Sequence, residues 1–214
     1  MIVEEIMTKN VFFLAPNDTI KTALQLMHAK TIRHIPLVDE NRHVVGLVTE
    51  RNIKEAAPAF LEEEDLSEKL EKPLSRIMKT NIITGHPLDF VEEVAVFFYE
   101  HKIGCLPIIS EKKLVGIVTG TDLLHTMVEL TGANQPGSQI EIKVPNRPGI
   151  LYEIAGVFRK HQINIHSVLV YPDKKDEQNK ILVFRVATMN PINMIAHLKK
   201  EGLHVLWPNM PGMS

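Results

Sequence analysis

The chain has 214 residues, and its 24 basic and 26 acidic side chains give a formal net charge of -2 at neutral pH. Hydrophobic residues make up 44% and charged residues 23% of the chain, which excludes an intrinsically disordered protein. The near-neutral charge provides no general attraction to nucleic acid or to an anionic membrane. We therefore expect a soluble globular protein with neither nucleic acid nor membrane among its partners.

The single cysteine, Cys105, excludes an intramolecular disulfide and a metal site made only of cysteines. Sparse cysteine is typical of proteins in reducing compartments. Glu4 and Glu5 stand near the N-terminus, where a signal peptide would carry positive charge. No uncharged apolar stretch approaches the roughly 18 residues of a membrane-spanning helix. These features predict a cytoplasmic protein.

An internal repeat organises much of the chain, because residues 6–52 recur at 77–122. Both copies close on nearly the same segment, Val44–Thr49 in the first and Leu114–Thr119 in the second. Such self-similarity indicates a duplicated structural unit. The other matched positions are Ile6-Met7 and Ile77-Met78, Pro16 and Pro87, Asp18 and Asp89, and Ile35-Pro36 and Leu106-Pro107.

Each copy has the pattern of a helix, two short apolar strands joined by a polar turn, and a second helix. We expect Asp18 and Asp89 to cap the first helix of each copy, with Glu92 close to a capping-box position. With a short strand expected before the first helix, each copy is a β-α-β-β-α unit of about 55 residues. Such a unit is too small to bury a good core alone, and the two copies should pack face to face. The apolar face of the first helix carries Ile20, Ala23, Leu24 and Met27 in copy one and Val91, Val94, Ala95 and Phe98 in copy two.

Beyond the second copy the pattern changes. A stretch rich in Gly, Pro, Asn and Ser, residues 131–139, marks a boundary, and the elements after it read β-α-β-β-α-β, a ferredoxin-like order. The predicted fold class is therefore α/β (α+β). The predicted segments are a first repeat at 1–58, an exposed acidic linker helix at 59–72, a second repeat at 73–131 and a C-terminal domain at 139–210. A partner-docking surface is the alternative for the linker.

Two family resemblances follow from these motifs. Gly46-Leu47-Val48-Thr49-x-x-Asn52 and Gly116-Ile117-Val118-Thr119-x-x-Asp122 resemble the closing motif of CBS domains. Residues 139–207, with Asn146-Arg147-Pro148-Gly149-Ile150 between strand and helix, resemble an ACT domain. This domain order is similar to a bacterial family of acetoin utilization proteins. The resemblance implies a non-catalytic regulatory protein that controls the breakdown of acetoin or butanediol, with a metabolic enzyme as a candidate partner.

The CBS resemblance implies an adenine nucleotide, such as AMP, ADP or ATP, as a regulatory ligand rather than a cofactor. The free amide groups and the positive dipole end of a helix that begins after Thr119 favour a phosphate. Asp122, one turn later, can accept hydrogen bonds from ribose hydroxyls. The strand at Leu106-Pro107 offers an apolar wall for a purine. The alternative is that Thr119 and Asp122 only cap the helix.

The two copies differ in ways that favour one cleft. Asn52 replaces the aspartate in copy one and accepts with only one oxygen. We expect Thr119 and Asp122 to hold the ribose, and Arg33 to reach across to the phosphates, although a surface ion pair is an equal alternative for Arg33. Family resemblance implies that Thr84 faces the adenine, where copy one has Phe13. The remaining candidates, all in copy one, are His34, Pro36, Thr49 and Arg51.

The ACT resemblance implies amino-acid binding around the loop Asn146, Arg147, Pro148, Gly149 and Ile150, commonly where two copies pair. Pro148-Gly149 lets the backbone turn sharply, and the amides at Gly149 and Ile150 could hold a carboxylate. Asn146 stands where the family usually has an acidic residue, so an ammonium group would lose a charged partner. A purely dimerising ACT domain is the alternative, and a homodimer is expected in either case.

Catalytic and metal chemistry have little support. The ten histidines show no metal-ligand spacing, and Cys105 lies in an apolar strand, as structural cysteines do. No nucleophile elbow or P-loop is present. We expect no catalytic residue and no metal. Two other functions remain open: a structural scaffold that dimerises and holds a metabolic enzyme, and an enzyme acting on a nucleotide.

Overall fold

The computed structural model describes residues 1–56 and 68–208 and divides into two compact units, Met1–Leu124 and His125–Ser214. Each unit is considered by itself. The predicted acidic linker at 59–72 falls mostly on residues 57–67, which lie outside the described part of the chain. Within the described part, no helix is both long enough and apolar enough to span a lipid bilayer.

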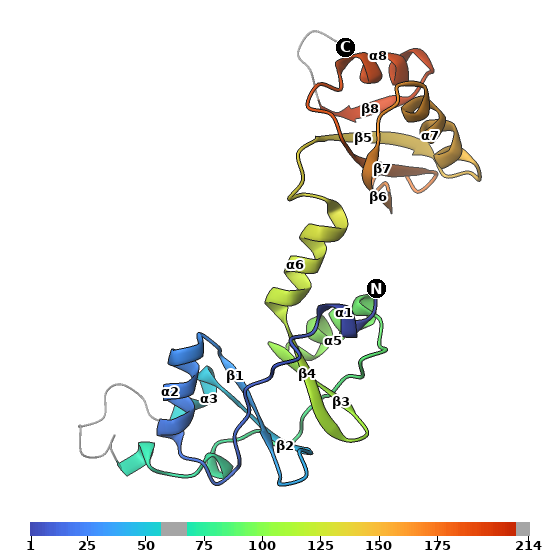
Figure 1. Cartoon of the computed structure of the whole chain (residues 1–214). Coiled ribbons are helices and arrows are strands. Elements are labelled where there is room, and N and C mark those ends of the chain that lie inside the picture. Colours follow the sequence, from blue (N-terminus) through green and yellow to red (C-terminus); the bar gives the residue numbers. More distant parts are fainter. Residues whose placement is uncertain (57–67, 209–214) are drawn as a thin grey trace. The chain divides into compact units, whose positions relative to one another are not determined.

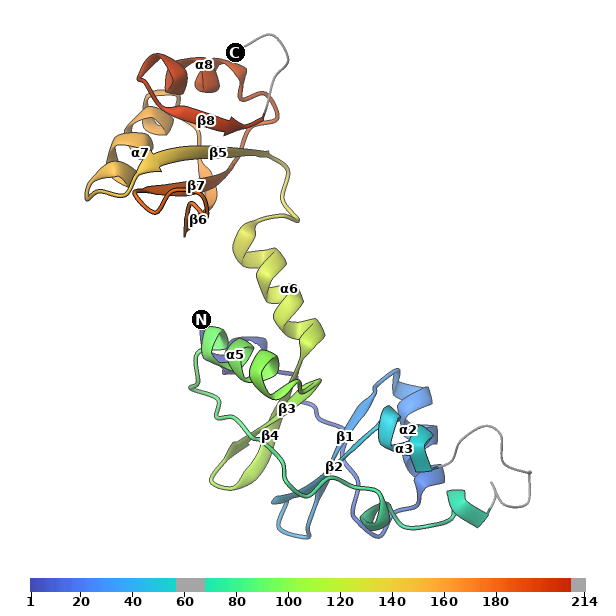
Figure 2. The same cartoon turned by 180° about the vertical axis from the view of Figure 1, so that it is seen from behind.

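The first unit, up to Leu124 in α6, holds the repeats, and each repeat has in chain order a helix, an antiparallel two-stranded hairpin and a second helix (Figures 1 and 2). This confirms the predicted helix–strand–strand–helix order. A short helix, α1 (Val3–Ile6), precedes the first repeat, and a 3-10 turn, η1 (Leu74–Arg76), precedes the second. The elements of repeat 1 are α2 (Ile20–Lys30), β1 (His34–Val38), β2 (Val44–Thr49) and α3 (Glu50–Ala56). Those of repeat 2 are α5 (Val91–His101), β3 (Cys105–Ser110), β4 (Lys113–Thr119) and α6 (Gly120–Thr131).

The apolar face of α2 packs into the core of repeat 1 as its spacing predicts. Ile20, Ala23 and Met27 are buried against Ile35 and other residues of the hairpin. Helix α5 follows the same rule less completely: Val91 and Val94 are buried, but Ala95 is exposed. Helix spacing thus identified the inner face in both copies, and the depth of burial differs between them.

The predicted aspartate caps are wrong in both copies. Thr19 is the N-cap of α2, and its hydroxyl accepts from the amide of Thr22. Phe90 precedes α5 and makes no side-chain cap. Asp18 and Asp89 instead turn back and accept from amides three residues earlier, those of Ala15 and His86, both at 2.7 Å. Each carboxylate closes the turn before the helix, because that turn has its own unpaired amide.

The opening segments of the two repeats are exchanged. Val3 of α1 is fully buried in the core of repeat 2, and its amide donates to the carbonyl of Asp89. Leu74 of η1 is fully buried in the core of repeat 1, and its amide donates to the carbonyl of Asp18. In both views α1 lies beside α5 (Figures 1 and 2). Each repeat therefore completes its core with a segment that precedes the other repeat in sequence.

The second unit has the predicted β-α-β-β-α-β order. Its antiparallel sheet has the strand order β6-β7-β5-β8, and its two helices cover one face. Phe158 from α7 and Phe184 from β7 meet in the core with ring centroids 4.7 Å apart. The elements are β5 (Ser138–Pro145), α7 (Ile150–Lys160), β6 (Ile165–Pro172), β7 (Asn179–Val186), α8 (Ile192–Lys200) and β8 (His204–Trp207).

Candidate functional site

The closing motif of repeat 2 joins a strand to a helix through a reciprocal pair. β4 ends at Thr119, and α6 begins at the next residue, Gly120. The amide and the hydroxyl of Thr119 donate to Oδ2 of Asp122, at 2.7 and 2.6 Å. The amide of Asp122 donates to the Thr119 hydroxyl at 3.4 Å. These are the reciprocal bonds of a capping box, so the helix-capping role that the sequence offered as an alternative is present, and they fix the Asp122 carboxylate beside the strand end.

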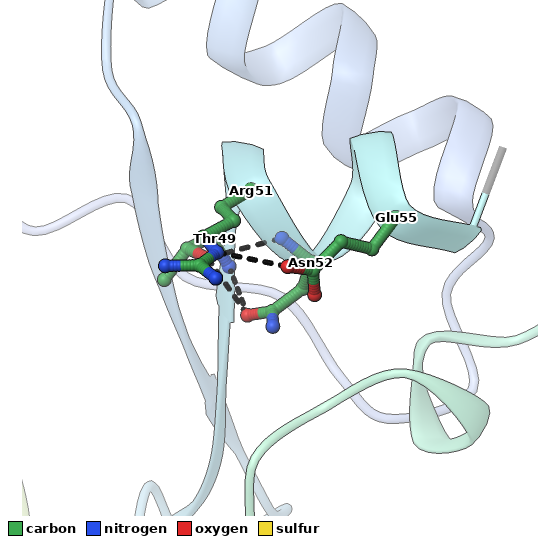
Figure 3. Close-up of polar contacts among 4 residues, drawn as sticks. All are labelled: Thr49, Arg51, Asn52 and Glu55. Carbon is green, nitrogen blue, oxygen red and sulfur yellow. Dashed lines mark hydrogen bonds and ion pairs between the residues drawn. The ribbon is translucent and has the colours of Figure 1, made fainter. Parts of the chain in front are cut away.

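Repeat 1 has the same arrangement with an amide in place of the carboxylate (Figure 3). The amide and hydroxyl of Thr49 donate to Oδ1 of Asn52, at 3.2 and 2.8 Å. The amide of Asn52 donates to the Thr49 hydroxyl at 3.2 Å. The two motifs are thus alike in geometry and differ in charge, as the sequence predicts.

Arg51 lies on the outer face of α3. Its Nε donates to the carboxylate of Glu55 one turn later, at 2.8 Å (Figure 3). The side chain of Arg51 is 85% exposed, and the Glu55 carboxylate raises the pKa of the guanidinium. This surface pair occupies Arg51 and leaves it a minor candidate for contact with phosphate.

Arg33 immediately precedes β1 of repeat 1, and His34 is its first residue. The carbonyl of Arg33 accepts from the amide of Glu50, the first residue of α3. The guanidinium is exposed and makes no ion pair within residues 1–56 and 68–208. His34 is half-buried, and a Cβ added to Gly104 of repeat 2 would lie 2.8 Å from its Nε2. The structure thus brings His34, rather than Arg33, against the opposite repeat.

Leu106 and Pro107, the predicted apolar wall for a purine, point to opposite faces of the β3–β4 hairpin. Leu106 is fully buried in the core of repeat 2, packed with Val94 and Val118. Pro107 is also buried, and it alternates with Leu106 along β3. Pro36 takes the matching buried position in β1. The side chain of Leu106 therefore contributes to packing.

Thr84 and Phe13 occupy matching places before the two hairpins. Thr84 is half-buried, and the next residue, Gly85, bonds the backbone of β3. In repeat 1, the Arg42 guanidinium carbon lies 5.0 Å from the centroid of the Phe13 ring. Phe13 and Arg42 also border a cavity of about 740 Å³ near the β1–β2 turn, which could not be predicted from the sequence because its walls come from distant segments.

The loop before α7 turns as predicted. Gly149 has φ of 83°, a left-handed conformation that favours glycine, and α7 begins at Ile150. Asn146 and Pro148 are exposed. Both guanidinium amines of Arg147 donate to the carboxylate of Glu153, at 2.8 and 2.7 Å, and this holds the pKa of Glu153 below its usual range. The cation nearest the predicted carboxylate site already has a partner.

The surroundings of Cys105 and of the histidines bear on catalytic and metal chemistry. Burial raises the pKa of the Cys105 thiol to about 12, so it is protonated at neutral pH. Among residues 1–56 and 68–208, no three His, Cys, Asp or Glu side chains are placed to hold a metal ion.

Comparison with known proteins bears on both units. Residues 3–59 and 74–129 match the CBS domain, and residues 138–200 match the ACT domain. The chain belongs to the CBS-domain family. It carries a tandem CBS pair followed by a C-terminal ACT domain, as its motifs predict.

Two solved structures are similar to this chain over somewhat less than two thirds of its length. A structure from Vibrio cholerae, provisionally named an acetoin utilization protein (AcuB), is 32% identical, with a TM-score of 0.55. It covers 64% of this chain and 98% of its own. The CBS pair of protein MJ0100, solved with 5′-methylthioadenosine and S-adenosyl-L-methionine, is 27% identical, with a TM-score of 0.53, and covers 63% of this chain and 98% of its own.

The third similar protein is an enzyme of which this chain matches a small part. A homoserine O-acetyltransferase of Methanococcus vannielii is 34% identical over 127 residues. The match takes in 59% of this chain but only 25% of the enzyme.

Proposed function

We propose that this protein is a regulatory sensor whose CBS pair binds an adenine-containing ligand at the Thr119–Asp122 motif. The observation that carries the proposal is the fixed Asp122 carboxylate at the point where β4 ends and α6 begins. A carboxylate held there can accept from both hydroxyls of a ribose. The binding of two adenosine compounds by the CBS pair of MJ0100 supports the same ligand class.

A ligand bound at the Thr119–Asp122 motif would change the relative arrangement of the two repeats. The repeats share exchanged segments and meet where His34 contacts Gly104. A ligand at this junction binds one relative arrangement of the repeats better than another, and that difference in affinity shifts their equilibrium. The altered state is read by a partner, for which we propose a metabolic enzyme of acetoin or butanediol breakdown. The similarity to the Vibrio cholerae protein supports that process.

For the ACT domain we propose an amino acid as ligand of the Gly149 loop. The exposed turn and the start of α7 at Ile150 offer backbone amides to a carboxylate. Asn146 offers an amide oxygen to the ammonium group. Arg147 keeps its bond to Glu153 and shapes the loop without contacting the ligand.

A dimeric scaffold is the second candidate, and strand β6 favours it. β6 lies at the edge of the ACT sheet, and four consecutive apolar side chains, Val168–Tyr171, are exposed on it. An apolar edge strand presents unpaired backbone groups to a second sheet. We propose that two copies of the protein pair through this edge.

Isothermal titration with AMP, ADP, ATP and S-adenosylmethionine tests the sensor. We expect saturable binding of an adenine ligand, weakened at least tenfold by Asp122→Ala because the ribose loses a charged acceptor, a loss of about 1.5–3 kcal/mol. Asn52→Ala, at the matching place in repeat 1, is the control and should change affinity less. Absence of binding by all four compounds would contradict the sensor, and equal losses in both variants would contradict the choice of cleft.

A further inference from the structure

One histidine lies at the junction of the two closing motifs. His34 is the first residue of β1 and pairs with Thr49 across the hairpin. A Cβ added to Gly104 of repeat 2 would lie 2.8 Å from Nε2 of His34, so the ring packs against the backbone of that glycine. The carbonyl of Gly104 accepts from the amide of Gly120, the first residue of α6, at 3.3 Å. The imidazole of His34 therefore reaches from the motif of repeat 1 to the backbone beside Thr119 in repeat 2.

The matching residue of repeat 2 cannot play the same part. The repeat places Cys105 where repeat 1 has His34, and Cys105 pairs with Thr119 as His34 pairs with Thr49. Burial raises the pKa of the Cys105 thiol to about 12, so this group stays neutral. Of these two equivalent positions, only His34 can change its charge near neutral pH.

The surroundings of His34 favour the neutral imidazole in the free protein. Burial is the largest influence and lowers the pKa of His34, and Arg33, the residue before β1, lowers it further. Glu50, at the start of α3, opposes them. From the side of repeat 2, Cys105 is protonated, and Lys79 is the charged group that acts on it. Burial and Arg33 together outweigh Glu50, so the half-buried imidazole is held toward its neutral form.

We propose that His34 selects adenine ligands that carry phosphate and that it takes up a proton when such a ligand binds. This rests on the proposed function. A phosphate group adds negative charge to that of Glu50, and an imidazolium donates a charge-assisted hydrogen bond to it. 5′-Methylthioadenosine, which has no phosphate, offers no such charge. The exposed guanidinium of Arg33 stands next to His34 and adds a second cation.

Proton uptake on ligand binding sets the direction in which nucleotide affinity changes with pH. Phosphate beside the ring stabilises the imidazolium, so the pKa of His34 in the complex lies above that in the free protein. Between these two values the complex holds one more proton than the free protein. Nucleotide affinity therefore rises as pH falls through that interval, by at most about tenfold per pH unit. Since burial lowers the free-protein pKa, the rise continues below the usual histidine value of about 6.5.

The test is isothermal titration of the full chain with AMP and with 5′-methylthioadenosine between pH 6 and 8. These two compounds share the adenosine and differ in the phosphate. Titration at fixed pH in PIPES and in Tris, whose ionisation heats differ, counts the protons taken up. His34→Gln keeps a polar side chain of similar size that cannot be protonated. The second ionisation of the AMP phosphate, near pH 6, also changes affinity with pH. It acts equally in His34→Gln, so the difference between the two proteins isolates the contribution of His34. His204→Gln, at the exposed start of β8, is the control.

We expect AMP to bind more tightly as pH falls, with proton uptake that His34→Gln removes and His204→Gln retains, and 5′-methylthioadenosine affinity to be flat. The same pH dependence in His34→Gln as in the unmodified protein would overturn the inference and leave the proposed function standing. Binding of 5′-methylthioadenosine without AMP would do the same. Failure of these two compounds and of ADP, ATP and S-adenosylmethionine to bind at any pH would overturn the proposed function and the inference with it.

Discussion

Single glycines decide how the opening segments dock on the hairpins. Gly46 in β2 and Gly116 in β4 occupy matching places in the two closing motifs. Each faces a methionine of an opening segment: a Cβ on Gly46 would lie 2.6 Å from Sδ of Met78, and Gly116 stands in the same relation to Met7. The glycine in each motif is therefore required by the close approach of the methionine.

Gly46→Ala tests this explanation. We expect the free energy of unfolding to fall by about 1–3 kcal/mol, since the added methyl group overlaps the sulfur in a packed interior. Urea denaturation followed by circular dichroism measures the change. In a Met78→Ala background the cost of Gly46→Ala should be smaller. An equal cost in both backgrounds would show that the contact with Met78 is not its cause.

At the scale of the element, the neighbouring strands β7 and β6 of the ACT sheet are both apolar but differ in burial. β7 is flanked by β6 and β5, and its Leu182, Phe184 and Val186 are buried beneath the helices. β6 has a neighbour on one side only, and its apolar residues stay exposed. The edge position, rather than composition, leaves β6 open to another chain.

Leu169→Lys tests whether this edge forms the dimer. We expect the unmodified protein to have twice the 24.2 kDa mass of one chain, and the variant to dissociate at micromolar concentration, because a lysine on an edge strand opposes pairing. Light scattering after size exclusion gives the mass. Tyr152→Lys, on the exposed face of α7, is the control and should remain dimeric. A dimer that survives Leu169→Lys would place the contact elsewhere.

At the scale of the molecule, the exchanged segments make each repeat depend on the other. Val3 fills the core of repeat 2, although it lies about 90 residues before that repeat's first helix in the chain. Leu74 fills the core of repeat 1 in the same way. Neither repeat has a complete core from its own contiguous sequence, and we expect the pair to unfold as one cooperative unit.

Val3→Ala tests this dependence through the thiol of Cys105. Removal of buried methyl groups should lower the free energy of unfolding by roughly 1–3 kcal/mol. Native Cys105 should react slowly with a thiol reagent, since it is buried and protonated, and Val3→Ala should speed the reaction by opening repeat 2. Leu74→Ala, in the core of repeat 1, should speed it also if the repeats unfold together. Acceleration by Val3→Ala alone would show that they open separately.

The sequence by itself determined the secondary-structure order, the repeat and the two families. Helical spacing and short apolar strands are local properties, so α2, the hairpins and the βαββαβ order could be predicted without tertiary information. The Thr119–Asp122 pair could be predicted for the same reason, because its two residues lie within one helical turn. The caps at Asp18 and Asp89 were wrong because a nearby turn amide competed for each carboxylate.

Only the tertiary structure decided which segments meet. Two similar opening segments can each serve either repeat, and no local pattern tells whether Val3 or Leu74 enters a given core. Sequence also could not place Leu106 in the core or set His34, instead of Arg33, against Gly104. These outcomes depend on packing between residues as far as about 90 positions apart in the chain, and such packing is fixed by the fold as a whole.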